Sequence, residues 1–235
     1  MANFLFDVDG TLTPSRKSIN RSFRKMFGGW ITEARSLGHK VFLVTGSDKR
    51  KSVQQLGVSL WRHISWDGCY QCSGNVLYIR NSVIKSASWV ASDDLKEDLK
   101  MIVEGSHWRN TATVKLEQRT GTCNFSTIGR NCSDEERQEY YTWDLVNKER
   151  DRIVKELSPK YPDLQFMIGG EISIDIFPKG RDKSQVVQDM SGETIYFGDR
   201  CHPNGNDYTI SQVCDSFYNV HSWMHTREIL KDIIL

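Results

Sequence analysis

Two aspartates separated by one residue follow an apolar run near the start of the 235-residue chain, in the segment FDVDGTLT at residues 6–13. A carboxylate at the end of a buried strand is costly unless it is paired with a cation or bound to a metal ion. Such a pair can also do chemistry: Asp7 can attack a phosphorus atom while Asp9 donates and accepts protons. A lone Asp-x-Asp is more often a surface turn or a helix cap, so this chemistry depends on what the rest of the chain supplies.

Further polar residues follow later predicted strands in the order that phosphoryl chemistry needs. Thr45 offers a hydroxyl after a hydrophobic strand, and Lys183 offers a positive charge at the start of a helix. Their simpler interpretations are a strand-end cap and a solvated helix residue. Mg²⁺ beside phosphate prefers hard oxygen ligands. We therefore expect a magnesium site formed by four aspartates at or just after strand ends: Asp7, Asp9, Asp199 and Asp207.

Strands and helices that alternate at both ends of the chain must position these residues. The apolar pattern predicts strands at 3–7, 40–44, 194–198 and 217–220, and helices at 18–37, 49–56, 183–190, from 207 onward and at 226–234. Strand–helix–strand order implies a parallel sheet whose active edge is at the carboxyl ends of the strands. Asp7, Asp9 and Thr45 would all lie at that edge.

The middle of the chain has a different pattern. Residues 75–85 and 113–128 alternate like antiparallel hairpins on either side of a charged helix near 93–103. A capping box at Ser133–Glu136 begins a helix that extends to about Leu157, and 165–177 forms one more strand. We predict an α/β protein with a Rossmann-like core and parallel sheet at 1–80 and 181–235, and an inserted α+β cap with an antiparallel sheet and helices at 81–180.

Composition limits the possible partners and compartments. The 31 lysines and arginines nearly balance the 30 acidic residues, so charge gives no reason to expect a nucleic-acid or membrane partner. No apolar run approaches the roughly 20 residues of a membrane span, and no secretory signal is evident, so we expect a cytoplasmic protein. Its six cysteines are then expected to be reduced. A zinc site of Cys69 and Cys72 with Cys201 and His202 is a minor alternative.

The core residues together resemble the haloacid dehalogenase-like phosphotransferase superfamily. The matching features are DVDGTLT after a strand, a threonine after the second strand, a helix-starting lysine, and a Gly-Asp followed by an Asn-Asp. The resemblance implies that Asp7 becomes phosphorylated and that Asp9 is both acid and base. It further implies that Thr45 and Lys183 hold the phosphoryl oxygens, while Asp199 and the Asp9 carbonyl complete the Mg²⁺ shell.

The middle segment is similar to the eukaryotic-type α-phosphomannomutase family. The similarity lies in IGRNCS-x-EER from residue 128, GG-x-IS-x-D-x-FPKG-x-DK from residue 169, and an arginine nine residues after Asp7. In that family arginines grip the phosphate that is not reacting, and a serine and an aspartate contact sugar hydroxyls. Planar guanidinium groups suit phosphate because they form paired, charge-assisted hydrogen bonds. The resemblance assigns these roles to Arg16, Arg119, Arg130, Arg137, Ser173 and Asp175.

The predicted function is therefore a phosphomannomutase that interconverts mannose-6-phosphate and mannose-1-phosphate. The resemblance also implies a hexose-1,6-bisphosphate activator, a homodimer formed through the cap, and a place in the mannose metabolism that leads to GDP-mannose. The first alternative is a Mg²⁺-dependent phosphatase of sugar phosphates or other small phosphate esters, with the same nucleophile. The second is a non-catalytic scaffold, which would have no need for the whole acidic and basic set.

Some basic residues have a simpler interpretation. Arg130 and Arg137 could form surface ion pairs with the glutamates of the following helix, and such pairs are common but weak. A second group is interpreted as solvated helix faces and is assigned no role: Arg24, Lys25, Lys49, Arg50 and Lys51.

Overall fold

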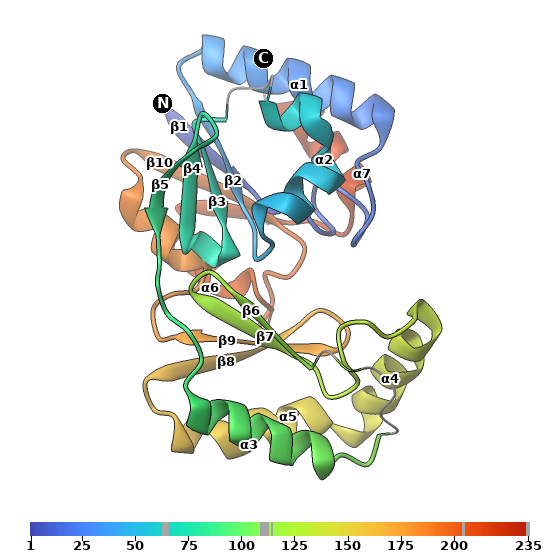
Figure 1. Ribbon diagram of the computed structural model, residues 1–235. Helices are drawn as coiled ribbons and strands as arrows, with labels where there is room; N and C mark the ends of the chain where they lie inside the picture. The colour runs from blue at the N-terminus through green and yellow to red at the C-terminus, as the bar shows by residue number, and fades with distance from the viewer. Residues whose placement is uncertain (63–65, 109–112, 114, 204, 234–235) are drawn as a thin grey trace. The chain divides into compact units, whose positions relative to one another are not determined.

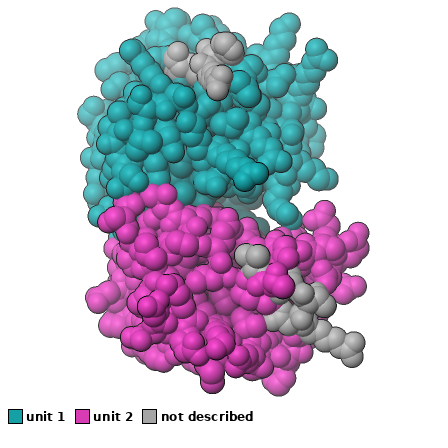
Figure 2. Space-filling model, in the orientation of Figure 1, with its two compact units in different colours: residues 1–86, 180–203, 207–235 teal, residues 87–179, 204–206 magenta. Residues whose placement is uncertain are grey.

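The computed structural model describes residues 1–62, 66–108, 113, 115–203 and 205–233. The chain divides into two compact units, which Figure 2 colours separately. The core unit contains Met1–Ser86, Gly180–Pro203 and Asp207–Leu235, and the cap unit contains Ala87–Lys179 and Asn204–Asn206. The cap unit is thus inserted into the sequence of the core unit.

The core unit is built on a seven-stranded sheet with the order β11-β10-β1-β2-β3-β4-β5 (Figure 1). The first five strands in this order are parallel, and β4 and β5 are antiparallel. The strands are β1 (Ala2–Phe6), β2 (Lys40–Val44), β3 (Gly68–Gln71), β4 (Val76–Ile79), β5 (Ser82–Ser86), β10 (Glu193–Gly198) and β11 (Ser216–Asn219). The helices are α1 (Arg21–Ser36), α2 (Lys49–Arg62), α6 (Tyr208–Val213) and α7 (Trp223–Ile233), with 3₁₀ turns at Cys72–Gly74 and Lys183–Asp189.

Apolar side chains bury both faces of this sheet, which explains why its strands are continuous apolar runs. Along β1, Phe4 and Phe6 join the hydrophobic cluster formed with α1, α2 and α7, whereas Leu5 joins the cluster on the other side with α6 and the 3₁₀ turn. Phe6 also stacks on Phe197 of β10, with the ring centroids 4.6 Å apart. This packing fixes the central strands, and therefore the loops that follow their carboxyl ends.

The cap unit contains a four-stranded antiparallel sheet with the order β6-β7-β9-β8. Its helices α3 and α5 pack on one face, where alternate residues of β7 and β9 form a hydrophobic cluster with Leu95, Leu99, Ile153 and Leu157. The elements are α3 (Asp93–Glu104), β6 (Leu116–Arg119), β7 (Thr122–Phe125), α4 (Asp134–Asn147), α5 (Glu149–Lys160), β8 (Leu164–Gly169) and β9 (Ser173–Pro178). A mainly parallel core sheet with a separate antiparallel sheet confirms the predicted fold class.

The prediction of one helix from Ser133 to about Leu157 is wrong. The capping box is present, but the helix divides into α4 and α5 at Lys148, which has a left-handed backbone with φ of 53°. Buried polar groups fix the break. Arg150 donates to Asp144 at 2.7 Å. The Glu149 carboxylate accepts hydrogen bonds at 2.6–2.9 Å from the hydroxyls of Ser106, Thr127 and Tyr140.

Three other segments also differ from the prediction. The single strand expected at 165–177 is a hairpin, because a turn at Gly170, with φ of 57°, separates β8 from β9. The helix expected at 183–190 is a 3₁₀ helix that begins after the Asp182 cap. The antiparallel hairpin expected at 75–85 is present as β4–β5, but it pairs with β3 in the core sheet, whereas residues from 81 onward were expected in the cap. The last predicted helix ends at Ile234, which lies outside the described residues, as does Val114 in the stretch 113–128.

The cysteines are free thiols. Cys69 and Cys72 are buried in and after β3, and Cys201 is buried after β10. Across the part of the chain that the structure describes, no helix combines the length and apolar character needed to cross a bilayer.

Candidate active site

Asp7, Lys183 and Asp207 form the buried centre of the core unit. Asp7 directly follows β1, and its amide donates to the carbonyl of Phe197 at 2.9 Å, so the neighbouring strands fix its position. The Lys183 ammonium lies 2.6 Å from a carboxylate oxygen of Asp7 and 2.6 Å from one of Asp207. The three side chains are almost completely buried. The fold therefore brings Lys183 against two carboxylates that are 176 and 24 positions away along the chain.

Burial and mutual repulsion control the ionisation of this centre. Burial raises the pKa of Asp7 well above its usual range, and Asp207 and Asp199 reinforce the increase against the attraction of Lys183. Burial also acts on Asp207, but attraction and a hydrogen bond from Lys183 outweigh it and lower the pKa of that carboxyl. The Lys183 pKa is raised, because the two carboxylates overcome the effect of its burial. One lysine thus faces more negative charge than it can neutralise.

Asp199 adds a third carboxylate to this centre. One carboxylate oxygen from each of Asp7, Asp199 and Asp207 lies within 4.8 Å of the other two. Burial, followed by repulsion from Asp207, raises the pKa of Asp199 to about 7. The donor set is made only of hard oxygens and carries excess negative charge, so it fits Mg²⁺. Gly10 permits the arrangement, because a Cβ at this position would lie 2.3 Å from the Asp199 carboxylate and the backbone φ is +80°.

Asp9 lies in a separate set of contacts beside this cluster. Its carboxylate accepts hydrogen bonds from the Lys51 ammonium at 2.5 Å, the Gln55 amide at 2.7 Å and the backbone N–H of Arg16 at 2.6 Å. Burial alone would raise the Asp9 pKa, but Lys51 outweighs it and the pKa is lowered. The interpretation of Lys51 as a solvated helix residue with no role is wrong, because its ammonium pairs with Asp9. Its position at the start of α2, after β2, was the available signal.

Thr45 directly follows β2, as predicted, and is buried. Its hydroxyl accepts a hydrogen bond from the backbone N–H of Ser47 at 3.2 Å, which is the strand-end cap of the simpler interpretation. Its backbone bonds to Tyr70 and Ser73 hold it against the neighbouring strand end. Because the hydroxyl acts as an acceptor in this contact, its own proton is available for an anion.

Tyr196 is a site residue that sequence reasoning missed. It lies on β10, and its hydroxyl donates to Asp207 at 2.6 Å while its ring is completely buried. The phenol pKa is raised well above its usual value by burial and by the nearby carboxylates. An aromatic residue within a strand normally belongs to the hydrophobic core, so the sequence carried no signal for this polar contact.

The register of the cap sheet gathers polar side chains on the face opposite α3 and α5. Glu117 of β6 pairs with Asn124 of β7, and Asn124 pairs with Asp175 of β9, so the three form a row across the sheet. The Asn124 amide donates to the Asp175 carboxylate at 2.5 Å. Since side chains alternate between faces, Arg119 shares the face of Glu117, and Ser173 shares that of Asp175. Two of the predicted sugar contacts therefore share a face of the cap sheet with a predicted phosphate contact.

The arginine cluster, defined as Arg119, Arg130 and Arg137, is on the cap unit. Arg119 and Arg130 both donate to the Glu117 carboxylate, at 2.9 Å and 3.2 Å, and Arg130 also donates to the Ser173 hydroxyl at 2.9 Å. Arg137, near the start of α4, lies 3.8 Å from a Glu171 oxygen. Burial and then repulsion from Arg119 lower the pKa of Arg130, and Arg137 contributes to the same shift. Arg119 and Arg130 thus converge on one carboxylate, and Arg137 lies near enough to add to the repulsion on Arg130.

Arg16 is the remaining predicted phosphate contact and lies in the core unit. Its backbone adopts the left-handed region, with φ of 60°, and its N–H donates to Asp9. The side chain is exposed. Its backbone thus helps to position Asp9, a contribution that the sequence did not indicate.

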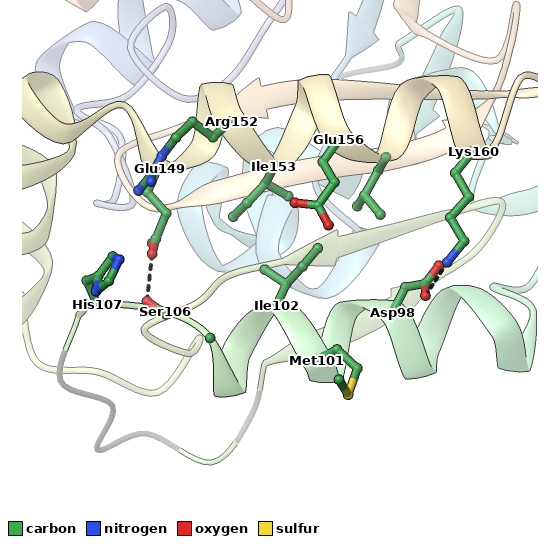
Figure 3. Close-up of a pocket in the computed structure, with 12 residues that line it drawn as sticks. Asp98, Met101, Ile102, Ser106, His107, Glu149, Arg152, Ile153, Glu156 and Lys160 are labelled. Carbon is green, nitrogen blue, oxygen red and sulfur yellow. Dashed lines mark hydrogen bonds and ion pairs between the residues drawn. The ribbon is translucent and has the colours of Figure 1, made fainter.

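A cavity of about 370 Å³ lies elsewhere on the cap unit, between α3 and α5 (Figure 3). Its lining includes the ion pair between Lys160 and Asp98 and the hydrogen bond from Ser106 to Glu149. Three carboxylates line it against two cations, which is a poor match for phosphate. None of the predicted site residues lines it.

Comparison with known proteins identifies the family. The family described as Eukaryotic phosphomannomutase matches residues 30–235 of the chain. The chain belongs to the eukaryotic phosphomannomutase family. Phosphomannomutase from Oryza sativa subsp. indica is 35% identical over 222 residues, which cover 88% of this chain and 84% of that protein. Phosphomannomutase 1 from Dictyostelium discoideum is 33% identical over 252 residues, which cover 97% and 95%.

Solved structures support the fold of this phosphomannomutase family member. A haloacid dehalogenase-like hydrolase from Bacteroides thetaiotaomicron superposes with a TM-score of 0.61 at 12% identity, covering 99% of each chain. An IMP-bound mutant of Plasmodium falciparum IMP-nucleotidase superposes with a TM-score of 0.64 at 13% identity, covering 99% of this chain and 66% of that one. At these identities the similarity concerns the fold alone.

Proposed function

We propose that this chain is a phosphomannomutase that interconverts mannose-6-phosphate and mannose-1-phosphate. The proposal rests on its family and on the two sets of charged residues described above. One set could transfer a phosphoryl group, and the other could hold a second phosphate. The activity requires both sets to reach the same sugar molecule during a catalytic cycle.

Asp7 is the proposed nucleophile. One of its carboxylate oxygens forms a bond to phosphorus as the bond between phosphorus and the sugar oxygen breaks. Lys183, 2.6 Å from Asp7, orients the carboxylate and supplies positive charge beside the reacting group. The Thr45 hydroxyl donates a hydrogen bond to a phosphoryl oxygen. The result is an aspartyl-phosphate and a sugar monophosphate.

Asp9 is the proposed acid and base. It donates a proton to the sugar oxygen that leaves, and it later takes a proton from the sugar hydroxyl that attacks the aspartyl-phosphate. Each cycle therefore returns Asp9 to its starting state. Its contacts with Lys51, Gln55 and the Arg16 amide fix the orientation of the carboxylate and favour its ionised form, which suits the base step; the acid step then uses a proton that the carboxylate has taken up.

Asp7, Asp199 and Asp207, with the backbone carbonyl of Asp9, would hold Mg²⁺. When bound, Mg²⁺ neutralises charge on the phosphoryl oxygens. The close approach of three carboxylates that a single lysine cannot balance supports this assignment. Lys183 and Tyr196 act on the protein side by holding Asp207 in place.

The arginine cluster is the observation that favours a mutase over a phosphatase. A phosphatase needs one phosphate site and water, whereas a mutase must hold a hexose-1,6-bisphosphate by the phosphate that is not reacting. Arg119, Arg130 and Arg137 present three guanidinium groups beside Ser173 and Asp175, which would contact sugar hydroxyls. Arg16 is proposed to join them on the same phosphate. Hexose-1,6-bisphosphate then supplies the first phosphoryl group to Asp7.

The decisive experiment follows both products in one reaction. The protein is incubated with mannose-1-phosphate, Mg²⁺ and a catalytic trace of hexose-1,6-bisphosphate, and phosphorus NMR records mannose-6-phosphate and inorganic phosphate. A mutase converts most of the substrate to mannose-6-phosphate and requires the bisphosphate. Release of inorganic phosphate without mannose-6-phosphate would refute the mutase and favour the phosphatase.

A further inference from the structure

Glu117 lies between two members of the arginine cluster, Arg119 and Arg130. One oxygen of its carboxylate accepts hydrogen bonds from Arg119 Nη2 at 2.9 Å and from Arg130 Nε at 3.2 Å. Two arginines that converge on one oxygen make the contact a phosphate oxygen would make. The carboxylate thus uses guanidinium N–H groups that the proposed substrate needs.

The position of Glu117 allows it to leave. Its side chain is 39% exposed, whereas that of Arg119 is 16% exposed, and it lies on β6 at the edge of the cap sheet. Burial raises the pKa of Glu117, but Arg119 and Arg130 outweigh this effect and lower it, so the carboxylate is ionised at neutral pH. A half-exposed, ionised side chain can exchange its arginine partners for water at small cost.

The charges around the arginine cluster also favour the displacement of Glu117. The three arginines face three carboxylates, those of Glu117, Glu171 and Asp175. Asp175 is bonded to the Asn124 amide, and Glu171 is 3.8 Å from the arginine it faces. The Glu117 carboxylate accepts hydrogen bonds from two members of the cluster, so its departure would free positive charge on both Arg119 and Arg130 for an incoming phosphate.

We propose that Glu117 is an exchangeable counter-ion of the arginine cluster, which holds Arg119 and Arg130 in place in the empty site and is displaced by the distal phosphate of the substrate. This inference rests on the proposed function. Glu117 is a positioning residue, because it acts through the arginines rather than on the sugar. Its competition weakens the grip on phosphate, which helps a hexose bisphosphate to detach from the arginines and turn over between two transfers.

The test compares Glu117→Gln with the unmodified chain. Glutamine keeps the shape and one oxygen acceptor but removes a negative charge about 5 Å from a phosphate dianion, which in a partly solvated site changes affinity by roughly three- to tenfold. We therefore expect mannose-1-phosphate to bind three- to tenfold more tightly by calorimetry in EDTA. In the mutase assay KM falls by a similar factor and kcat falls as well. A residue with only a structural role would give weaker binding.

Controls make the result specific to the cluster. Glu97→Gln removes the same charge from an exposed position on α3, where the carboxylate pairs with Lys100, and should leave the affinity unchanged. Adding Arg130→Ala to Glu117→Gln should abolish the gain. Circular dichroism verifies folding, and Glu117→Thr, a residue suited to a strand, must show the same direction of change.

The possible outcomes separate this inference from the proposed function. Unchanged or weaker binding by both Glu117 variants would overturn the counter-ion role, whatever the enzyme does. Tighter binding of mannose-1-phosphate by a protein that releases only inorganic phosphate would support the counter-ion role of Glu117 and refute the proposed mutase activity. Tighter binding with a lower KM and a lower kcat would support both.

Discussion

Replacing Lys183 with methionine tests how the buried charges of the core unit are balanced. The ammonium lies 2.6 Å from both Asp7 and Asp207 and is 1% exposed. Methionine retains a flexible chain of similar volume, so packing changes little. The substitution removes the cation that both carboxylates share and leaves them close to Asp199.

Breaking a buried ion pair by removing one partner costs about 3–5 kcal/mol, because it leaves an uncompensated buried charge. Lys183→Met should therefore lower the free energy of unfolding by about 3–5 kcal/mol in the absence of a divalent cation. For a urea slope of about 2–3 kcal/mol/M, the midpoint shifts downward by about 1–2.5 M. Adding Asp207→Asn to the variant removes one of the stranded charges and should restore part of the loss.

Urea denaturation of the intact chain at pH 7.5 in EDTA, followed by circular dichroism, measures these differences. Lys100→Met is the control. Its ammonium forms an exposed pair with Glu97 at 3.3 Å, and exposed pairs of this spacing contribute about 0.5 kcal/mol or less. Added Mg²⁺ should stabilise Lys183→Met more than the unmodified chain, because the variant site has more unbalanced negative charge. A loss below about 1 kcal/mol, or a double variant as unstable as the single one, would refute this account.

Three further predictions concern the proposed catalytic residues. Asp7→Asn should fold and bind substrate but lose at least roughly a thousandfold in kcat, because an amide is a poor nucleophile; retained turnover in the coupled assay would reject the assignment. Arg130→Ala should lower kcat/KM for mannose-1-phosphate about 10- to 100-fold through loss of charge-assisted hydrogen bonds, whereas equal activity would remove the case for a second phosphate site. Lys51→Met should cost about 1 kcal/mol or less of stability at pH 7, since Lys51 is 38% exposed. The lowered Asp9 pKa makes that contribution present above the unfolded value of about 3.9 and lost as the pH falls through the folded value, so urea midpoints of variant and parent should converge in acid.

The local spacing of apolar residues was sufficient to predict most strands and helices of the core unit. The pattern at 40–44 matches β2, and the pattern at 18–37 contains α1, because a buried strand and an amphipathic helix leave distinct apolar spacings. The prediction was wrong where the spacing of apolar residues did not distinguish one strand from two. The apolar alternation of 165–177 continues through Gly169 and Gly170, so nothing in the period marks the turn that makes a hairpin.

The break at Lys148 had no local signal either. Residues on both sides have helical character. The break is accompanied by two buried contacts: the Glu149 carboxylate accepts a hydrogen bond from Thr127, and Arg150 donates to Asp144 of α4. Thr127 lies outside the segment, so that contact cannot be read from the segment itself. The same limit explains Lys51, which looks like one more lysine on a charged helix until β1 and β2 bring Asp9 beside it.

The sequence alone determined the chemical types that are available: aspartates after strands, a lysine at a helix start, and arginines in a segment of different pattern. It could do so because strand ends and helix starts are local features that the spacing of apolar residues marks. Only the tertiary structure decided which groups meet. The sheet register puts Glu117 between Arg119 and Arg130, and the packing of β1 against β10 encloses Lys183 with three carboxylates. Electrostatic energy depends on distances between groups far apart in the chain, and those distances exist only after folding.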